Sequence, residues 1–395
     1  MKNLTKHRLA EWDPWLIVPM VILCVLGIIM VYSASAVAQY QSASGPTAYL
    51  VRQSIFVVIG LGVCYFIASV NIEKCRNQYV LSGFGLLVLV ALVFVKVAGK
   101  AVNGAQGWIV LGPISIQPAE VCKLFLIMFL ANFFDNYLRY PKMFQGSIKW
   151  FPGTIVMLMF LLILVQPDLG GAAINLAIAG VIFLSARVPW RRAVTILTGV
   201  VLVAIFGMPW LSQLALKVIH GYKAARFIGY LNPFGSASGA GSQLVNSYYA
   251  ISNGGLFGKG LGNSIQKMGY LPEPNTDFIL AVIAEELGLI AVILILTGLA
   301  IIVCRCVQTG ARATTPYDTM VCYGTATFIL VEASFNIGAV CGVMPITGVT
   351  LPFISYGGSS MVVLCAALGL VLNVSRRQRR QRMMAKQKKA VTENG

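Results

Sequence analysis

The chain has 395 residues, of which 57% are hydrophobic and 11% are charged, and its formal net charge is +17. Soluble domains carry about 25% charged residues, so this composition excludes a soluble enzyme. The apolar runs are long and continuous, without the alternation of barrel strands, and they predict an all-α, polytopic membrane protein.

The apolar runs give the predicted elements in chain order. A helix needs about 20 mostly apolar residues to cross the hydrocarbon core of a bilayer. We predict ten transmembrane helices, at residues 15–34, 50–70, 79–97, 118–135, 151–167, 169–186, 192–210, 277–303, 318–342 and 351–374. They form a single transmembrane domain over residues 1–375, which carries one large extracellular loop at 211–276, between the seventh and eighth helices. A basic tail follows at 376–395.

The basic residues predict the orientation of the chain. Lys and Arg are enriched in cytoplasmic loops, and most of those in this sequence share one side if the N-terminus is cytoplasmic, including eight in residues 376–389. We therefore expect both termini in the cytoplasm. The tail either only sets this orientation or also binds anionic lipid. A short basic run beside a membrane helix is not typical of nucleic-acid binding, so no nucleic-acid partner is expected.

The predicted loop at 211–276 is rich in Gly, Ser and Asn, with aromatic residues between them. Loops of this length usually carry function or are disordered, and the interleaved Tyr, Phe and Leu residues favour order. Glycine-rich backbone can approach a ligand closely, and its N–H groups can cradle phosphate. A phosphate-binding loop and a flexible lid both remain open.

Three carboxylates, Glu120, Asp168 and Asp277, are predicted at the outer ends of membrane helices. Ionisable groups in membrane segments are functional candidates by default. Glu120 lies three residues before Lys123 on one helix face, which fits either a structural charge pair or a binding site. Asp168 follows Pro167 and fits a helix N-cap as well as a catalytic group.

Asp277 is predicted to open the eighth helix, after the sequence Leu-Pro-Glu-Pro-Asn-Thr at residues 271–276. Thr276 is available as a helix cap, so the position does not require an acid for structural reasons. Glu285 and Glu286, deeper in the same helix, point to different sides, and we interpret them as packing or polar-network residues.

The chemistry that fits these groups is glycosyl transfer from a lipid pyrophosphate. A carboxylate can accept the proton of an attacking sugar hydroxyl, and cations on the outer side, among them Arg226, Lys259 and Lys267, can stabilise the departing pyrophosphate. His7 and His220 fall on opposite faces, which excludes a two-histidine metal site. A transporter with carboxylates in the membrane fits the same composition, so the residues alone leave both classes open.

Four segments, in order along nearly the whole chain, resemble the signature blocks of the SEDS family (shape, elongation, division and sporulation). They lie at residues 108–123, 166–170, 232–288 and 347–360. Residues 262–267 and 345–352 resemble the division branch of the family more than the elongation branch. The sequence departs from the family pattern, without loss of a charged motif residue, at Ala119, Gly171, Ser242 and Asn275.

The resemblance implies a peptidoglycan glycosyltransferase that polymerises lipid II on the outer face of the bacterial plasma membrane. It implies a class B penicillin-binding protein as partner, other division-complex membrane proteins, and a location at the septum. The essential aspartate of the family falls on Asp277, and a second block falls on Gln117 to Glu120, followed by Lys123. No metal ligand set is evident, although a divalent cation at the pyrophosphate stays open.

We therefore expect Asp277 to be the catalytic base of an inverting transfer. The expected substrate-binding residues are Gln117, Glu120, Lys123, Asp168, Arg226, Lys259 and Lys267. The alternatives are a lipid II flippase, an elongation-type polymerase, and a scaffold that only recruits the penicillin-binding protein.

Overall fold

The computed structural model describes residues 11–40, 47–102, 105–111, 114–144, 150–217, 222–237, 239 and 241–393, and it is mainly helical. The elements in chain order are α2 (Pro14–Tyr40), α3 (Ala48–Ser69), α4 (Ile72–Cys75), α5 (Gln78–Ala98), β1 (Lys100–Val102), β2 (Ala105–Leu111), β3 (Ile114–Ile116), α6 (Pro118–Arg139), η1 (Pro141–Phe144), α7 (Phe151–Val165), α8 (Leu169–Arg187), α9 (Trp190–Leu216), α10 (Tyr222–Leu231), η3 (Phe234–Ser236), α11 (Ser242–Gly254), α12 (Ile279–Ala311), α13 (Pro316–Val340) and α14 (Gly358–Glu393). His7 and His220 lie outside the described residues.

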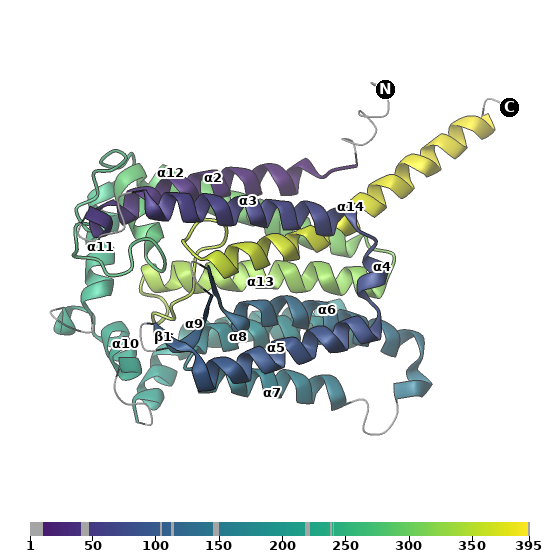
Figure 1. The fold of residues 1–395 in the computed structure, drawn as a ribbon, viewed down its shortest axis with the longest axis horizontal. Coiled ribbons are helices and arrows are strands. Elements are labelled where there is room, and N and C mark those ends of the chain that lie inside the picture. Colours follow the sequence, from purple (N-terminus) through teal and green to yellow (C-terminus); the bar gives the residue numbers. More distant parts are fainter. Residues whose placement is uncertain are drawn as a thin grey trace.

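The long helices lie side by side in one bundle (Figure 1). Within the described part of the chain, nine of the ten predicted spans coincide with helices long and apolar enough to cross a membrane. The fifth predicted span coincides with α7, which is apolar but has only 15 residues. The all-α membrane fold is confirmed, and the count of ten spans stays a prediction.

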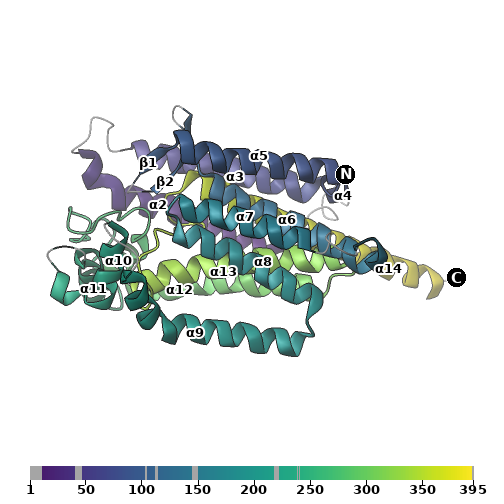
Figure 2. The ribbon, with the colours of Figure 1, turned by 90° about the horizontal axis from the view of Figure 1, so that it is seen from below.

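The helices differ in how much of their surface the bundle covers. The apolar part of α14 is buried on nearly all sides, at the centre of the bundle, whereas no residue in the most apolar stretch of α9 is fully buried. Figure 2 shows α9 standing at the edge of the bundle. Both sequences are apolar all round, because lipid and protein interior favour the same side chains.

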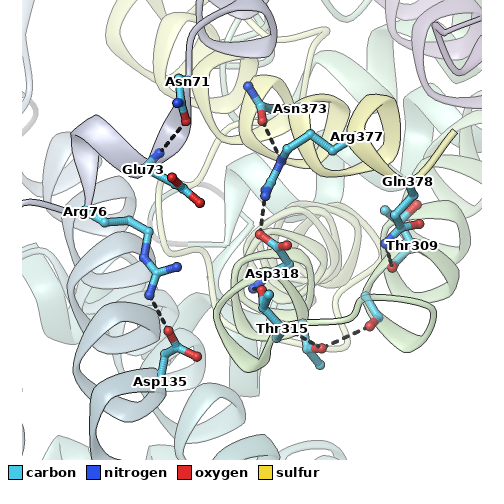
Figure 3. A network of polar contacts seen from close by, with 12 residues as sticks. Asn71, Glu73, Arg76, Asp135, Thr309, Thr315, Asp318, Asn373, Arg377 and Gln378 are labelled. Carbon is cyan, nitrogen blue, oxygen red and sulfur yellow. Dashed lines mark hydrogen bonds and ion pairs between the residues drawn. The ribbon is translucent and has the colours of Figure 1, made fainter. Parts of the chain in front are cut away.

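The described chain begins and ends at the same end of the bundle, and α10 and α11 lie at the opposite end (Figure 1). At the end with the termini, Asp13 accepts bonds from Arg305 (2.8 Å) and Arg379 (2.9 Å). Arg377 binds Asp318 at 2.7 Å (Figure 3). These ion pairs fix the start of the basic tail, which continues α14 as a helix away from the bundle (Figure 1).

A second group of ion pairs at this end joins the α4 region to α6. Arg76 binds the buried Asp135 (Figure 3), which also binds Arg139. The guanidinium of Arg76 lies 4.3 Å from the centre of the Tyr317 ring on α13. Arg76 therefore contacts both α6 and α13.

The predicted loop at 211–276 is largely ordered structure. Its first residues extend α9, and it contains α10, η3 and α11. A small antiparallel sheet, which the sequence analysis did not predict, precedes α6: β2 pairs with both β1 and β3. The pairing of Ile109 with Ile116 delivers the chain to the first turn of α6.

Helix α12 is broken at Gly288, whose φ of +77° is not helical. The segment after α11 pairs with the backbone at this break. The N–H groups of Lys259 and Gly260 donate to the carbonyls of Glu285 and Glu286, both at 2.9 Å. A helix break in an apolar bundle would otherwise leave carbonyls without partners, so the loop and the break stabilise each other.

The side chains of Glu285 and Glu286 bind the same segment, which confirms their interpretation as polar-network residues. Glu285 accepts bonds from Asn253 (3.1 Å) and Ser264. Glu286 accepts from Lys267 (2.6 Å) and from Ser33 of α2. All the acceptor oxygens belong to fully buried residues.

The Lys267–Glu286 pair gives a first testable prediction. Removing one partner of a buried ion pair costs about 3–5 kcal/mol, so Lys267→Met is expected to lower the free energy of unfolding by that amount, measured by denaturant titration of the purified protein in detergent. Lys259→Met is the matched control, because this exposed lysine lies in the same segment. The double variant Lys267→Met with Glu286→Leu removes both charges and should recover much of the loss. Equal stability of Lys267→Met and the wild type would show that the pair contributes nothing.

Candidate active site

A cavity of about 570 Å³ lies at the end of the bundle that carries the sheet and α10. Its walls combine the first turns of α6, α8 and α14 with the segments at 273–277 and 344–357. Apolar side chains such as Trp108 and Ile346 line it together with carboxylates and cations. A site of this mixed character can hold a ligand that is partly sugar or phosphate and partly hydrocarbon.

Asp277 lines this cavity from the segment that precedes α12. The main chain around it is held by two buried polar side chains. The amide of Asn336 donates to the carbonyls of Asp277 (2.9 Å) and Val349 (2.8 Å). The hydroxyl of Ser355 donates to the carbonyl of Thr276 at 2.7 Å. The backbone at Asp277 is therefore fixed. Asp277 does not open α12 as predicted: it lies two residues before the first residue of that helix, and Thr276 does not cap it.

Two charged side chains lie around Asp277. Burial raises the pKa of its carboxyl to about 7, and the nearby Glu273 adds to the increase, whereas the positive charge of Arg226 opposes it. A Cβ atom placed on Gly348 would lie 3.5 Å from both the Arg226 guanidinium and the Asp277 carboxylate. Arg226 and Asp277 thus flank the same glycine, and a carboxyl with a pKa near neutrality suits proton transfer at physiological pH.

A second charged group lies at the cavity wall. Glu120 and Lys123 line the cavity, and the buried Glu332, which does not line it, completes the group. The ammonium of Lys123 lies 2.5 Å from Glu120 on its own helix and 3.8 Å from Glu332 on α13. Thr350 and Ser360 each donate a hydroxyl to Glu332 at 3.0 Å. The lysine side chain is 1% exposed, so this group is a built polar centre between α6 and α13.

Glu332 is not among the site residues that were predicted from the sequence. The only available signal was an acid in an apolar stretch, and nothing local showed that α13 packs against α6. The predicted pair of Glu120 with Lys123 is present, and both residues line the cavity.

Asp168 caps α8, as the sequence suggested, by accepting the N–H of Gly171 at 2.7 Å. Its other oxygen accepts the side-chain amide of Gln117 at 3.3 Å, and both residues line the cavity. Burial raises the pKa of Asp168, whereas the bond from Gly171 lowers it. The same carboxylate therefore serves as a helix cap and as part of the cavity wall.

Two predicted site residues do not reach the cavity. Lys267 is buried and paired with Glu286, and Lys259 is exposed on the segment beside the break in α12. Neither lines the cavity, so the structure does not bring them together with the other predicted site residues. The reason is that the loop folds back on α12, where the buried Glu286 requires a cation. Of the three cations predicted to stabilise the pyrophosphate, Arg226 is the one that lines the cavity.

Comparisons with known proteins point to one family. The model of the FtsW/RodA/SpoVE family, described as cell cycle proteins, matches residues 14–380. The chain is 37% identical over 382 residues to a protein of Enterococcus hirae named probable peptidoglycan glycosyltransferase FtsW, with 94% of each chain covered. It is also 37% identical to stage V sporulation protein E of Bacillus subtilis, over 93% of this chain and 98% of that one.

Solved structures agree with the sequence relatives. One is a chain from a structure that describes the structural coordination of polymerization and crosslinking by a peptidoglycan synthase complex. It is 25% identical with a TM-score of 0.70, over 94% of this chain and 99% of that chain. The rod shape determining protein RodA of Thermus thermophilus is 27% identical with a TM-score of 0.64, over 92% of this chain and 97% of that chain.

The position of Gly348 gives a second prediction. Its φ is +77°, a left-handed conformation that costs a residue with a Cβ about 1–2 kcal/mol. Gly348→Ala is therefore expected to lower the free energy of unfolding by about that amount. Gly199→Ala on α9 is the matched control: its Cβ meets open space, and alanine favours a helix over glycine by about 1 kcal/mol. The two variants should shift the denaturant midpoint in opposite directions, and a shared direction would contradict the prediction.

Proposed function

The chain belongs to the FtsW/RodA/SpoVE family of cell cycle proteins, which is the SEDS family that its motifs resemble, and we propose that Asp277 in the described cavity carries its chemistry. The protein is a peptidoglycan glycosyltransferase that polymerises lipid II, as its relatives' names indicate. The division branch fits best, since several relatives 36–38% identical to this chain are named FtsW. The observation that supports the role of Asp277 is its carboxylate in an amphiphilic cavity, beside Arg226.

The proposed step is an inverting displacement. The deprotonated Asp277 accepts the proton of the acceptor sugar hydroxyl as its oxygen bonds to the anomeric carbon of the donor. The bond from that carbon to the pyrophosphate breaks, and the electron pair leaves with the lipid pyrophosphate. The guanidinium of Arg226, which lines the same cavity, stabilises the charge that develops on this leaving group.

The remaining polar residues position substrate in this proposal. Lys123 is shared by Glu120 and Glu332, so its charge is already neutralised and it is less suited than Arg226 to hold a pyrophosphate. The Glu120 and Asp168 carboxylates and the amide of Gln117 provide hydrogen-bond partners for sugar hydroxyls. The apolar wall of the cavity provides the surface against which a polyprenyl chain leaves the site.

The cellular setting extends the proposal. The protein is a multi-pass membrane protein. We place it in the bacterial plasma membrane at the septum, with both termini in the cytoplasm and the cavity at the outer face. A class B penicillin-binding protein is the proposed partner, by analogy with the synthase complex that couples polymerization to crosslinking. Other division-complex membrane proteins complete the assembly.

A divalent cation at the pyrophosphate is a further part of the proposal. Within the residues that the structure describes, no three His, Cys, Asp or Glu side chains gather in a way that could hold a metal ion. Polymerisation assays with EDTA, and with Mg²⁺ added back, test this requirement.

Replacement of the proposed base gives the third prediction. Loss of a general base typically costs about 10²–10⁴-fold in rate. Asp277→Asn is therefore expected to fold and insert normally but to polymerise purified lipid II at least about 100-fold more slowly, measured on gels in the presence of the partner. Lys259→Met, outside the cavity, is the control with unchanged rate. A near-normal rate for Asp277→Asn would remove this carboxylate from the mechanism, and movement of lipid II between leaflets without polymer would favour a flippase.

The pH dependence gives the fourth prediction. Only deprotonated Asp277 accepts a proton, and its pKa is about 7. The rate constant should therefore rise with pH, with a midpoint near 7 and a decrease of about tenfold per pH unit well below it. Glu273→Gln removes a negative charge that raises this pKa, so it should move the midpoint to lower pH. A midpoint that stays in place would show that another group controls the rate.

A further inference from the structure

A second cavity, of about 490 Å³, lies far from the site, toward the end of the bundle where the chain begins and ends. It is a groove between α6, α7 and α8, which lie together in the bundle (Figure 2). Its walls are apolar and include Phe134 of α6, Val156 of α7 and Phe183 of α8. None of the residues assigned to the glycosyl transfer lines it, so the groove is independent of the active site.

Two glycines on the facing helices contribute to the hollow. A Cβ atom added at Gly153 of α7 or at Gly180 of α8 would meet no other atom within 4 Å. Glycine is a poor helix former and is not needed here for a close approach of two backbones. The space in front of Gly180 is therefore room within the groove, which larger side chains at this position would fill.

One cation lies at the end of the groove that is nearest the chain termini. Arg187, in the last turn of α8, lines it, and its guanidinium lies over the rings of Tyr137 (4.3 Å) and Phe183 (5.7 Å). Among the described residues, no carboxylate forms an ion pair with Arg187, unlike Arg139, which binds Asp135. Stacking on rings fixes the guanidinium plane and leaves its N–H groups for a planar or phosphate acceptor.

A membrane phospholipid has both an apolar chain and a charged headgroup. Arg187 and Trp150, which is 67% exposed, lie at the helix ends, where tryptophan side chains meet the lipid headgroups. Ala179 lies two turns deeper than Arg187, so the groove reaches about 12 Å from the headgroup level into the hydrocarbon. Arg191 and Arg192 follow on α9, and a basic surface at this end attracts anionic lipid.

A phospholipid matches the groove in both respects, because its acyl chain can pack against the apolar walls and its phosphate can bind Arg187. We propose that this groove binds one anionic phospholipid, with an acyl chain between α6, α7 and α8 and the phosphate on Arg187.

The test uses full-length protein in detergent, titrated with dioleoyl phosphatidylglycerol or dioleoyl phosphatidylcholine, with retained lipid counted by native mass spectrometry. The wild type should retain one phosphatidylglycerol with about tenfold higher affinity than phosphatidylcholine, because a charge-assisted bond to phosphate contributes to the former alone. Arg187→Gln should abolish this preference. Arg191→Gln, the neighbouring arginine outside the groove, should keep it.

A second pair of variants tests the apolar part. Gly180→Leu fills the groove and should lose the tightly bound lipid, whereas Gly199→Leu places the same side chain in open space on α9 and should retain it. Equal unfolding temperatures of the two variants confirm that both are folded. Equal affinity for the two lipids in the wild type, or equal retention by the two leucine variants, would overturn the proposal. The experiment measures no glycosyl transfer, so its failure would leave the proposed function unaffected.

Discussion

The cost of placing a charge inside an apolar bundle governs this structure. An isolated ion in a medium of low dielectric constant loses many kcal/mol of hydration energy, which only a partner with good geometry offsets. Several deeply buried acids accordingly have cationic partners: Asp13 has two arginines, Asp135 has two, and Glu286 has Lys267. These pairs connect helices that are distant in sequence, and so they fix the architecture as well as neutralise charge.

Asp277 gives the site its chemistry. Among the described residues it takes part in no ion pair, and its fixed backbone presents the carboxylate to a cavity, where burial raises its pKa. The side chains of Asn336 and Ser355 donate hydrogen bonds to the main chain around this residue and not to its carboxylate. A group held in this way is positioned for proton transfer and is available to a substrate.

The segment between α9 and α12 contacts both the cavity and the buried Glu286. It supplies Arg226 to the cavity through α10, and Lys267 to Glu286 through its later residues. It also pairs with the carbonyls at the break in α12, the helix that follows Asp277. One extramembrane segment thus delivers a cation to the site and stabilises the helix that follows Asp277.

The apolar helices and the candidate carboxylates could be predicted from the sequence, and Asp168 could be recognised as a possible cap, because hydropathy, charge and capping depend on neighbouring residues in the chain. It also limited the site to groups at helix ends, and its motifs indicated Asp277. The packing of the helices decided the rest. Lys259, Lys267 and Arg226 have the same sign and lie in the same loop, yet only Arg226 reaches the cavity, and Glu332 joins Lys123 only because α13 packs against α6. Lipid and protein interior favour the same apolar side chains, so the pattern of one helix does not encode its neighbours, and the partner of a buried charge is known only from the folded bundle.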